Sequence, residues 1–223
     1  MPYPAVIAID GPAGAGKSTL GAMLAERLGY LYFDTGVMYR ALTLVAMQTA
    51  TPLQDATALE ALAAQVKIEV TAPAHDDGRQ YTVWADDQDV TWAIRDPAIE
   101  GNVSLVAAVP GVRRELIRQQ QQIGRRGQVV MVGRDIGTVV MPDAGLKIFL
   151  EASLEERARR RNDERLAQTE NPSLEQIRAA LARRDQLDQH VLTPAPDAVR
   201  LNTDDLSPAD EVAWIINYLS QQG

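Results

Sequence analysis

Cysteine is absent from this 223-residue sequence, so disulfide bonds and thiolate metal sites are excluded. Histidine is scarce: only His75 and His190 occur, far apart in the chain, which argues against a histidine metal site or a catalytic triad. No apolar run approaches the length of a membrane span, and the stretch MPYPAVIAID lacks the basic region and cleavage site of a signal peptide. We therefore expect a cytoplasmic protein.

Positive charge is in short supply as well. The net charge is −8, whereas a general nucleic-acid binder needs a basic surface to displace counterions, so we expect neither nucleic acid nor a membrane as partner. The only lysines are Lys17, Lys67 and Lys147, and arginine supplies nearly all the other cations. Because the planar guanidinium group matches the geometry of phosphate, the arginines are the first candidates for binding an anionic ligand.

Apolar strands alternate with helical segments along most of the chain. Runs such as QVVMV are typical of parallel strands covered on both faces. The last helix carries Trp214, Ile215 and Leu219 on its apolar side. The pattern predicts an α/β fold, a parallel five-stranded sheet flanked by helices, in a single domain over 1–223. Strands are expected at 5–10, 30–34, 128–132, 146–150 and 198–201, and helices at 17–28, 36–47 and 208–221.

Two segments depart from this alternation. In the approximate range 66–95, the short stretches KIEV, QYTVWA and QDVT are separated by turn-forming residues, which predicts a small antiparallel insert. In the approximate range 153–187, the chain is helical and rich in arginine and glutamate, with a break at ENPS (170–173). Ser173 is a plausible helix cap there, so we expect a helical hairpin.

A glycine-rich turn follows the first strand. GPAGAGKST fits the pattern G-x-x-x-x-G-K-[ST] between a strand and a helix, the context in which backbone N–H groups bind phosphate. It predicts a nucleoside triphosphate site in which Lys17 reaches the β- and γ-phosphates and the Ser18 hydroxyl joins a Mg²⁺ shell. A GTPase switch is disfavoured because no N/T-K-x-D element is present. The expected ATP-binding residues are Gly11, Pro12, Ala13, Gly14, Ala15, Gly16, Lys17, Ser18 and Thr19.

Polar residues follow two other strands at their carboxyl ends, where open α/β sheets bind ligands. Thr35, Tyr39 and Arg40 follow the second strand, and Arg134 and Asp135 follow the strand at 128–132. Arg134 and Asp135 could neutralise each other, or they could bind separate groups of a ligand. Their positions alone leave both interpretations open.

Four stretches together carry a family resemblance: IDGPAGAGKST, FDTGVMYR, GRDIGTVVMPDAGLKIFLEASLEERARRR and RRDQLD. They resemble bacterial cytidylate kinase, of the P-loop nucleoside monophosphate kinases, over almost the whole length. The resemblance implies a P-loop kinase fold in which the insert is the monophosphate-binding part and the hairpin is a lid. It also implies transfer of phosphate from ATP, with Mg²⁺, to CMP and dCMP by a monomer.

The same resemblance implies roles for individual residues. Arg40 and Arg134 would hold the acceptor phosphate with help from Thr35, and Tyr39 would pack beside the sugar. The cytosine would face Ser104, Arg113 and Asp135, and the ribose would meet Arg184 and Asp188. The catalytic cations would be Lys17, Arg134, Arg157 and Arg161, the last two from the lid. Apart from the resemblance, we expect Mg²⁺ to be held by Ser18 of the phosphate loop and, through water, by Asp34.

Two positions depart from the family pattern. Val132 stands where the family usually has an acidic residue, and Val191 where it tends to have an arginine. Metal binding and base selectivity could differ for these reasons. The alternatives are a related kinase that acts on UMP, AMP or shikimate, or a nucleotide-binding module without turnover.

Overall fold

The computed structural model describes residues 3–166 and 173–221. The chain divides into two compact units, one made of Met1–Gly29 with Val130–Gly223 and the other of Tyr30–Val129. A five-stranded sheet has the strand order β2-β6-β1-β7-β8, and a separate sheet has the order β3-β4-β5. The strands of the larger sheet are β1 (Val6–Asp10), β2 (Leu31–Asp34), β6 (Val129–Val132), β7 (Leu146–Glu151) and β8 (Val199–Asn202). The predicted fold class is confirmed.

Strand β1 is buried along its whole length, as its unbroken apolar run predicts. It pairs in parallel with β7, so that Ile7 lies opposite Leu146, and β7 pairs in parallel with β8. Because parallel strands end at the same edge of a sheet, the loops after β1 and β7 open on one side of this unit.

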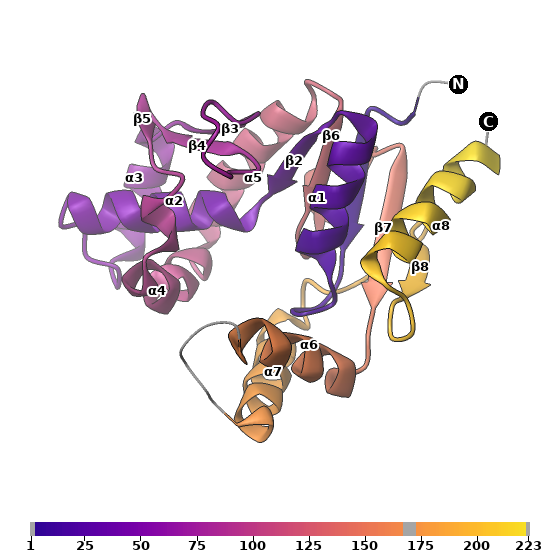
Figure 1. Cartoon of the computed structure of the whole chain (residues 1–223). Helices are drawn as coiled ribbons and strands as arrows, with labels where there is room; N and C mark the ends of the chain where they lie inside the picture. The colour runs from indigo at the N-terminus through magenta and orange to yellow at the C-terminus, as the bar shows by residue number, and fades with distance from the viewer. Residues whose placement is uncertain (1–2, 167–172, 222–223) are drawn as a thin grey trace. The chain divides into compact units, whose positions relative to one another are not determined.

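Helices α1 (Lys17–Leu28) and α8 (Pro208–Gln221) pack against each other and lie side by side in Figure 1. Gly29 ends α1 in the left-handed conformation, with φ = 68°, and its N–H caps two carbonyl groups of the last turn. Ile215 of α8 is fully buried, whereas Trp214 stays 38% exposed and stacks on Tyr218. The apolar side of α8 is therefore narrower in the structure than predicted, because Trp214 lies at its margin.

Helices α6 (Leu154–Leu166) and α7 (Leu174–Asp188) form the predicted hairpin (Figure 1). Ser173 caps α7: its side chain accepts from the Gln176 N–H, while the Gln176 side chain accepts from the Ser173 N–H. The cap prediction is confirmed, and residues 170–172 of the predicted break lie outside the described residues.

The second unit contains the antiparallel insert. Strands β3 (Ile68–Thr71), β4 (Thr82–Ala85) and β5 (Gln88–Asp89) pair in sequence order, as predicted. Helix α2 packs against α4, and α3 packs against α5. The helical segments are α2 (Gly36–Gln48), α3 (Ala56–Gln65), the 3₁₀ turn η1 (Ala93–Arg95), α4 (Pro97–Ala107) and α5 (Pro110–Gly124).

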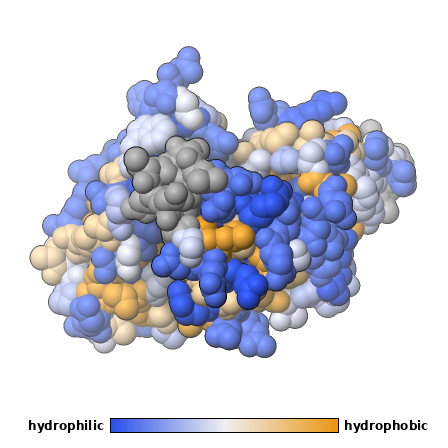
Figure 2. Space-filling model, turned by 60° about the horizontal axis from the view of Figure 1, so that its bottom comes forward, coloured by the Kyte–Doolittle hydropathy of each residue, from blue (hydrophilic) through white to orange (hydrophobic). Residues whose placement is uncertain are grey.

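The face of the molecule in Figure 2 is mostly hydrophilic, and apolar side chains appear on it in separate patches. Within residues 3–166 and 173–221, none of the helices has both the length and the apolar character needed to cross a bilayer.

Candidate functional site

The turn between β1 and α1 has the geometry of a phosphate loop. Gly11 has φ = 148°, and a Cβ there would lie 2.6 Å from the Leu150 carbonyl oxygen, so glycine is required. Gly16, with φ = 90°, is the N-cap of α1 and offers no side-chain acceptor to the N–H groups of the first turn. Those N–H groups and the helix dipole together attract an anion.

Lys17 lies across this loop. Its Nζ donates to the carbonyl oxygens of Gly11 at 2.8 Å and of Pro12 at 2.7 Å, and the residue is only 8% exposed. Charged phosphate oxygens accept stronger hydrogen bonds from an ammonium group than carbonyl oxygens do. Lys17 is therefore placed to exchange its loop partners for a phosphate.

Asp10, at the end of β1, was not among the predicted site residues. Its carboxylate accepts hydrogen bonds from the backbone N–H groups of Ile136 at 2.7 Å and Gly137 at 2.8 Å. Burial raises the pKa of Asp10 and the charge of nearby Asp135 adds to this, although the two N–H groups oppose the shift. Asp10 thus fastens the GRDIG segment to the strand that leads into the phosphate loop.

The GRDIG segment continues as a π-helical turn, η2 (Ile136–Val140). Before this turn, Arg134 donates through Nε to Oδ2 of Asp188 at 2.7 Å, and Arg184 Nε lies 3.9 Å from the same oxygen. Three predicted site residues are therefore brought together. The carboxylate that Arg134 contacts belongs to α7, and it is not the adjacent Asp135.

Arg157 of α6 is 5% exposed and contacts the phosphate loop. Its guanidinium group donates to both carboxylate oxygens of Asp185 in α7, at 2.7 and 3.0 Å, and to the Ala13 carbonyl oxygen at 3.1 Å. A cation at this loop suits the transfer of a phosphoryl group. Arg157 lies in the hairpin, and both the role of the hairpin as a lid and the contact of Arg157 with a substrate stay predictions.

The other arginines of α6 differ from one another. Arg159 is exposed and pairs within the helix with Glu156 and Asp163, the ordinary arrangement of a solvated helix face. Arg160 bonds to Glu156 and to Thr203, so it joins α6 to the segment after β8. Arg161 is exposed, and its predicted catalytic role stays a prediction.

Glu211, in the first turn of α8, was also missed. It is only 2% exposed, and its two carboxylate oxygens lie 4.0 Å from the point where a Cβ would stand on Gly16. Burial raises the pKa of Glu211 to about 7, and the charge of Arg160 opposes this shift only in part. Acidic residues are ordinary in the first turn of a helix, so the sequence gives no sign that this one is buried.

The predicted residues after β2 lie in the second unit, on or next to α2. Thr35 is buried and precedes the helix, Asp34 Oδ1 accepts from the Gly36 N–H at 2.9 Å, and Arg40 forms an ion pair with Glu100 of α4. Tyr39 is also on α2. Ser104 and Arg113 lie on α4 and α5, which pack against each other. The predicted acceptor residues of this unit therefore lie on or next to helices that pack against one another.

Metal ligands are few. Within the described ranges 3–166 and 173–221, no group of three or more His, Cys, Asp or Glu side chains is arranged to hold a metal ion. Val132 is buried in β6 and offers no ligand. Mg²⁺ ordinarily keeps several waters and binds substrate phosphates through few protein groups, so Ser18 beside Lys17 fits such an ion.

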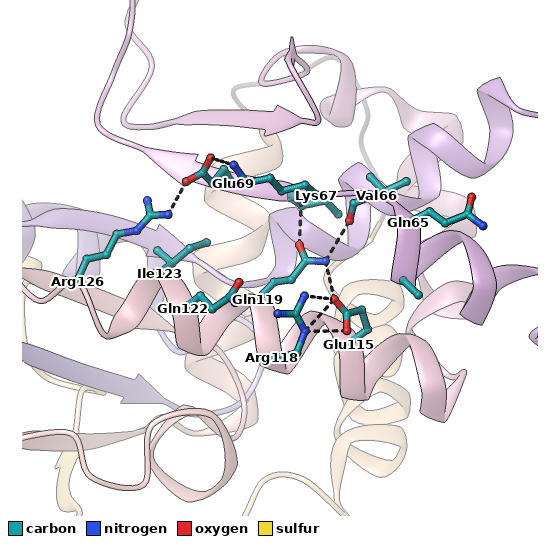
Figure 3. A pocket seen from close by; sticks show the side chains of 12 residues that line it. Gln65, Val66, Lys67, Glu69, Glu115, Arg118, Gln119, Gln122, Ile123 and Arg126 are labelled. Atoms are coloured by element: carbon teal, nitrogen blue, oxygen red, sulfur yellow. Dashed lines mark hydrogen bonds and ion pairs between the residues drawn. The ribbon is translucent and has the colours of Figure 1, made fainter.

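A cavity of about 110 Å³ in the second unit lies beside β3 and α5 and contains none of the predicted site residues (Figure 3). The Gln119 side chain accepts from the Ile68 N–H at 2.8 Å and donates to the Val66 carbonyl oxygen at 3.0 Å. The charged residues around it pair with one another, as the dashed lines show: Arg118 with Glu115, and Arg126 and Lys67 with Glu69. The two hydrogen bonds of Gln119 attach α5 to the start of β3, whereas the pair of Arg118 with Glu115 lies within α5.

The parallel sheet, the phosphate loop and the arginine-bearing hairpin define a P-loop kinase. Solved structures of other kinases share this fold, among them the following two. Shikimate kinase from Bacteroides thetaiotaomicron has a TM-score of 0.54 at 14% identity, covering 97% of this chain and 98% of its own. A gluconokinase from Sinorhizobium meliloti has a TM-score of 0.50 at 15% identity, covering 100% and 95%. Identities this low show the fold alone.

Sequence comparison identifies the family. The model of the family described as cytidylate kinase matches residues 7–221. The cytidylate kinase of Chloroflexus aggregans is 61% identical and that of Roseiflexus castenholzii 54% identical, each over 217 residues that cover 97% of this chain and 94% of the relative. The chain belongs to the cytidylate kinase family, which confirms the resemblance.

Proposed function

We propose that this protein transfers the γ-phosphoryl group of ATP to CMP and dCMP, giving ADP with CDP or dCDP, in pyrimidine nucleotide metabolism. Membership of the cytidylate kinase family supports this activity. The structural observation that carries it is the contact of Asp10 with the backbone of 136–137, which holds Arg134 and Asp135 near the strand that leads into the phosphate loop.

ATP binds through residues 11–19. The backbone N–H groups of the loop and Lys17 hold its phosphates, as the geometry of Gly11 and Gly16 favours. Mg²⁺ would be held by the Ser18 hydroxyl and, through water, by Asp34, and it would supply positive charge to the phosphate oxygens. Both residues offer oxygen ligands, which this ion prefers.

The acceptor binds through the residues that the family resemblance assigns to it. Arg40, Arg134 and Thr35 hold its phosphate, and Tyr39 packs beside the sugar. Arg184 and Asp188 bind the ribose. The contact of Asp188 with Arg134 supports this, because Arg134 is proposed to hold the phosphate of the same nucleotide. Ser104, Arg113 and Asp135 face the base.

Cytosine is selected by its hydrogen-bonding pattern. Its exocyclic amino group is a donor that suits the Asp135 carboxylate, and its carbonyl oxygen and ring nitrogen are acceptors that suit the Arg113 guanidinium. Uracil would place a carbonyl oxygen against Asp135 instead. An unpaired buried acceptor costs about 1–3 kcal/mol, which is enough to favour CMP.

The chemical step requires no general base. A phosphate monoester has a second pKa of about 6, so the attacking oxygen of CMP is already anionic near neutral pH. The protein has to position two anions and offset their repulsion. Lys17, Arg134, Arg157 and Arg161 supply the positive charge that does so.

The larger arrangement is proposed on the same basis. The chain acts as one kinase domain over 1–223, with residues 66–95 as the monophosphate-binding insert and residues 153–187 as the lid. We propose a cytoplasmic monomer whose partners are ATP, CMP and dCMP, without nucleic acid or membrane.

A coupled assay of ADP release with CMP, dCMP, UMP, AMP and shikimate tests the activity. We expect the highest kcat/KM with CMP or dCMP, a lower value with UMP, and no turnover with AMP or shikimate. Equal rates with CMP and AMP would contradict pyrimidine selection. Binding of ATP without turnover of any acceptor would contradict the kinase activity itself.

A further inference from the structure

Arg157 is bonded to protein through all three nitrogens of its guanidinium group. Nε donates to the Ala152 carbonyl oxygen at 3.2 Å, and Nη1 donates to the Ala13 carbonyl oxygen at 3.1 Å. Nη1 also donates to Asp185 Oδ1 at 3.0 Å, and Nη2 donates to Asp185 Oδ2 at 2.7 Å. One side chain thus joins α6, α7 and the phosphate loop.

These bonds limit what Arg157 can offer to a ligand. A guanidinium group has five N–H donors, and the four bonds leave one N–H, on Nη2. A bidentate grip on a phosphate needs two donors, so it would require Arg157 to release one of its present partners, Ala152, Ala13 or Asp185. Because Arg157 is 5% exposed, releasing Asp185 would leave a buried charge without its partner.

Packing holds the same three elements together. Ala13 of the loop packs against the apolar cluster of the hairpin, which contains Ala158, Ile177 and Leu181. A Cβ on Gly14 would lie 3.3 Å from the Cβ of Arg157, so the loop and α6 approach closely. A shift of Arg157 would therefore shift the backbone of the phosphate loop.

Asp188, three residues further along α7, is arranged differently. Only its Oδ2 contacts Arg134, so Oδ1 can accept from a ligand, and its side chain is 23% exposed. Both oxygens of Asp185 are engaged by Arg157. The two carboxylates therefore suit different tasks: Asp188 suits a substrate contact, and Asp185 suits the fixing of Arg157.

We infer that Asp185 is a positioning residue for phosphoryl transfer. It holds Arg157 against the Ala13 carbonyl group, and Arg157 presents its remaining N–H to the phosphates from that fixed place. Arg157 then remains attached to Asp185 during turnover. The inference rests on the proposed function, since it assigns a role in the same reaction.

Steady-state kinetics of Asp185→Asn, Asp185→Glu and Asp188→Asn in the full chain tests this role. Because a displacement of about 1 Å can lower a rate by about 10²-fold, we expect Asp185→Asn to lower kcat about 10- to 100-fold, with the KM for CMP within about twofold of wild type. Asp185→Glu keeps the charge and should recover part of kcat. Asp188→Asn should chiefly raise the KM for CMP.

Glu155→Gln is the matched control. Glu155 faces Arg178 across the same two helices at 4.0 Å, but this pair is exposed and far less constrained, so kcat should not change. Arg157→Lys, alone and combined with Asp185→Asn, provides a second test that does not depend on one variant. If the two residues act as a unit, the double variant should be no slower than the slower single variant.

The outcomes separate the inference from the proposed function. Absence of turnover by the wild type with CMP would overturn the function. With an active wild type, an unchanged kcat in Asp185→Asn, or a raised KM for CMP without a change in kcat, would overturn the inference. Multiplying losses in the double variant would also overturn it.

Discussion

Arg134 and Asp135 stand side by side after β6, and Arg134 donates to Asp188 of α7 at 2.7 Å. Asp135 is 6% exposed and lies close enough to Asp10 to help raise the pKa of that carboxyl group. The two neighbours therefore act in separate places. In the proposed complex, Arg134 meets the acceptor phosphate and Asp135 meets the cytosine amino group.

We predict that Asp135→Ala loses most of the preference for CMP over UMP. The carboxylate accepts from the amino group of cytosine and opposes the carbonyl group of uracil, so its removal should reduce the discrimination by about 1–3 kcal/mol. The ratio of kcat/KM for the two acceptors measures this, and the KM for ATP serves as the internal control. An unchanged ratio would show that Asp135 has a structural role only.

Glu211 predicts a dependence of stability on pH. With its pKa raised by burial from 4.5 to about 7, the folded protein keeps a proton that the unfolded chain releases, so its contribution to the free energy of unfolding falls as the pH rises through this range. We therefore expect the free energy of unfolding of Glu211→Gln, relative to that of the wild type, to increase by roughly 2–3 kcal/mol from about pH 4 to pH 8.

Urea denaturation at several pH values measures the effect of Glu211. The control is Asp205→Asn, because Asp205 is exposed in the segment just before α8 and should give a constant difference from wild type. A constant difference for Glu211→Gln as well would show that its carboxyl group titrates normally in the folded protein.

Single residues were predictable where a local pattern defines them. The phosphate loop and the Ser173 cap follow from fixed spacings between neighbouring residues. Asp10 could not be found in this way, because its partner Ile136 lies 126 positions away in the sequence. Nothing local distinguishes Asp10 from an ordinary residue at the end of a strand.

At the scale of elements, β1, β6 and β7 were predictable because they are buried on both faces and read as apolar runs, whereas β8, with Arg200 and Asn202 exposed, has a weaker pattern. The π-helical turn after β6 was not foreseen. Its bonds run from the N–H groups of Val140 and Met141 to carbonyl groups five residues earlier, and this spacing leaves no periodic pattern in the sequence. Asp10 stabilises the turn from outside, so its cause is tertiary.

Gln119 predicts how firmly α5 is attached to β3. Replacing it by leucine removes the acceptor for the Ile68 N–H and the donor to the Val66 carbonyl group, so we expect a loss of about 1–3 kcal/mol in the free energy of unfolding. Gln122→Leu is the matched control, because Gln122 lines the same cavity but is exposed. Thermal or urea unfolding measures both, and equal losses would contradict the assigned role.

At the scale of the whole molecule, the predicted acceptor residues are divided between two compact units. Arg134, Asp135, Arg184 and Asp188 belong to one, and Thr35, Tyr39, Arg40, Ser104 and Arg113 belong to the other. Thr35, Tyr39, Arg40, Arg134 and Asp135 are candidates because they follow strands of the predicted sheet. The other four are predicted only through the resemblance to the family. The central proposal is that both groups bind one nucleotide. A local sequence pattern cannot show this, because it carries no information about which distant residues bind the same ligand.

A double-mutant cycle with Arg40→Gln and Arg134→Gln tests this proposal most directly. If both guanidinium groups hold the phosphate of one CMP molecule, each single variant should lower kcat/KM for CMP at least tenfold, with little change in the KM for ATP, and the two effects should be coupled. Full kcat/KM for CMP in either single variant would contradict the account, because that arginine would then take no part in binding the acceptor.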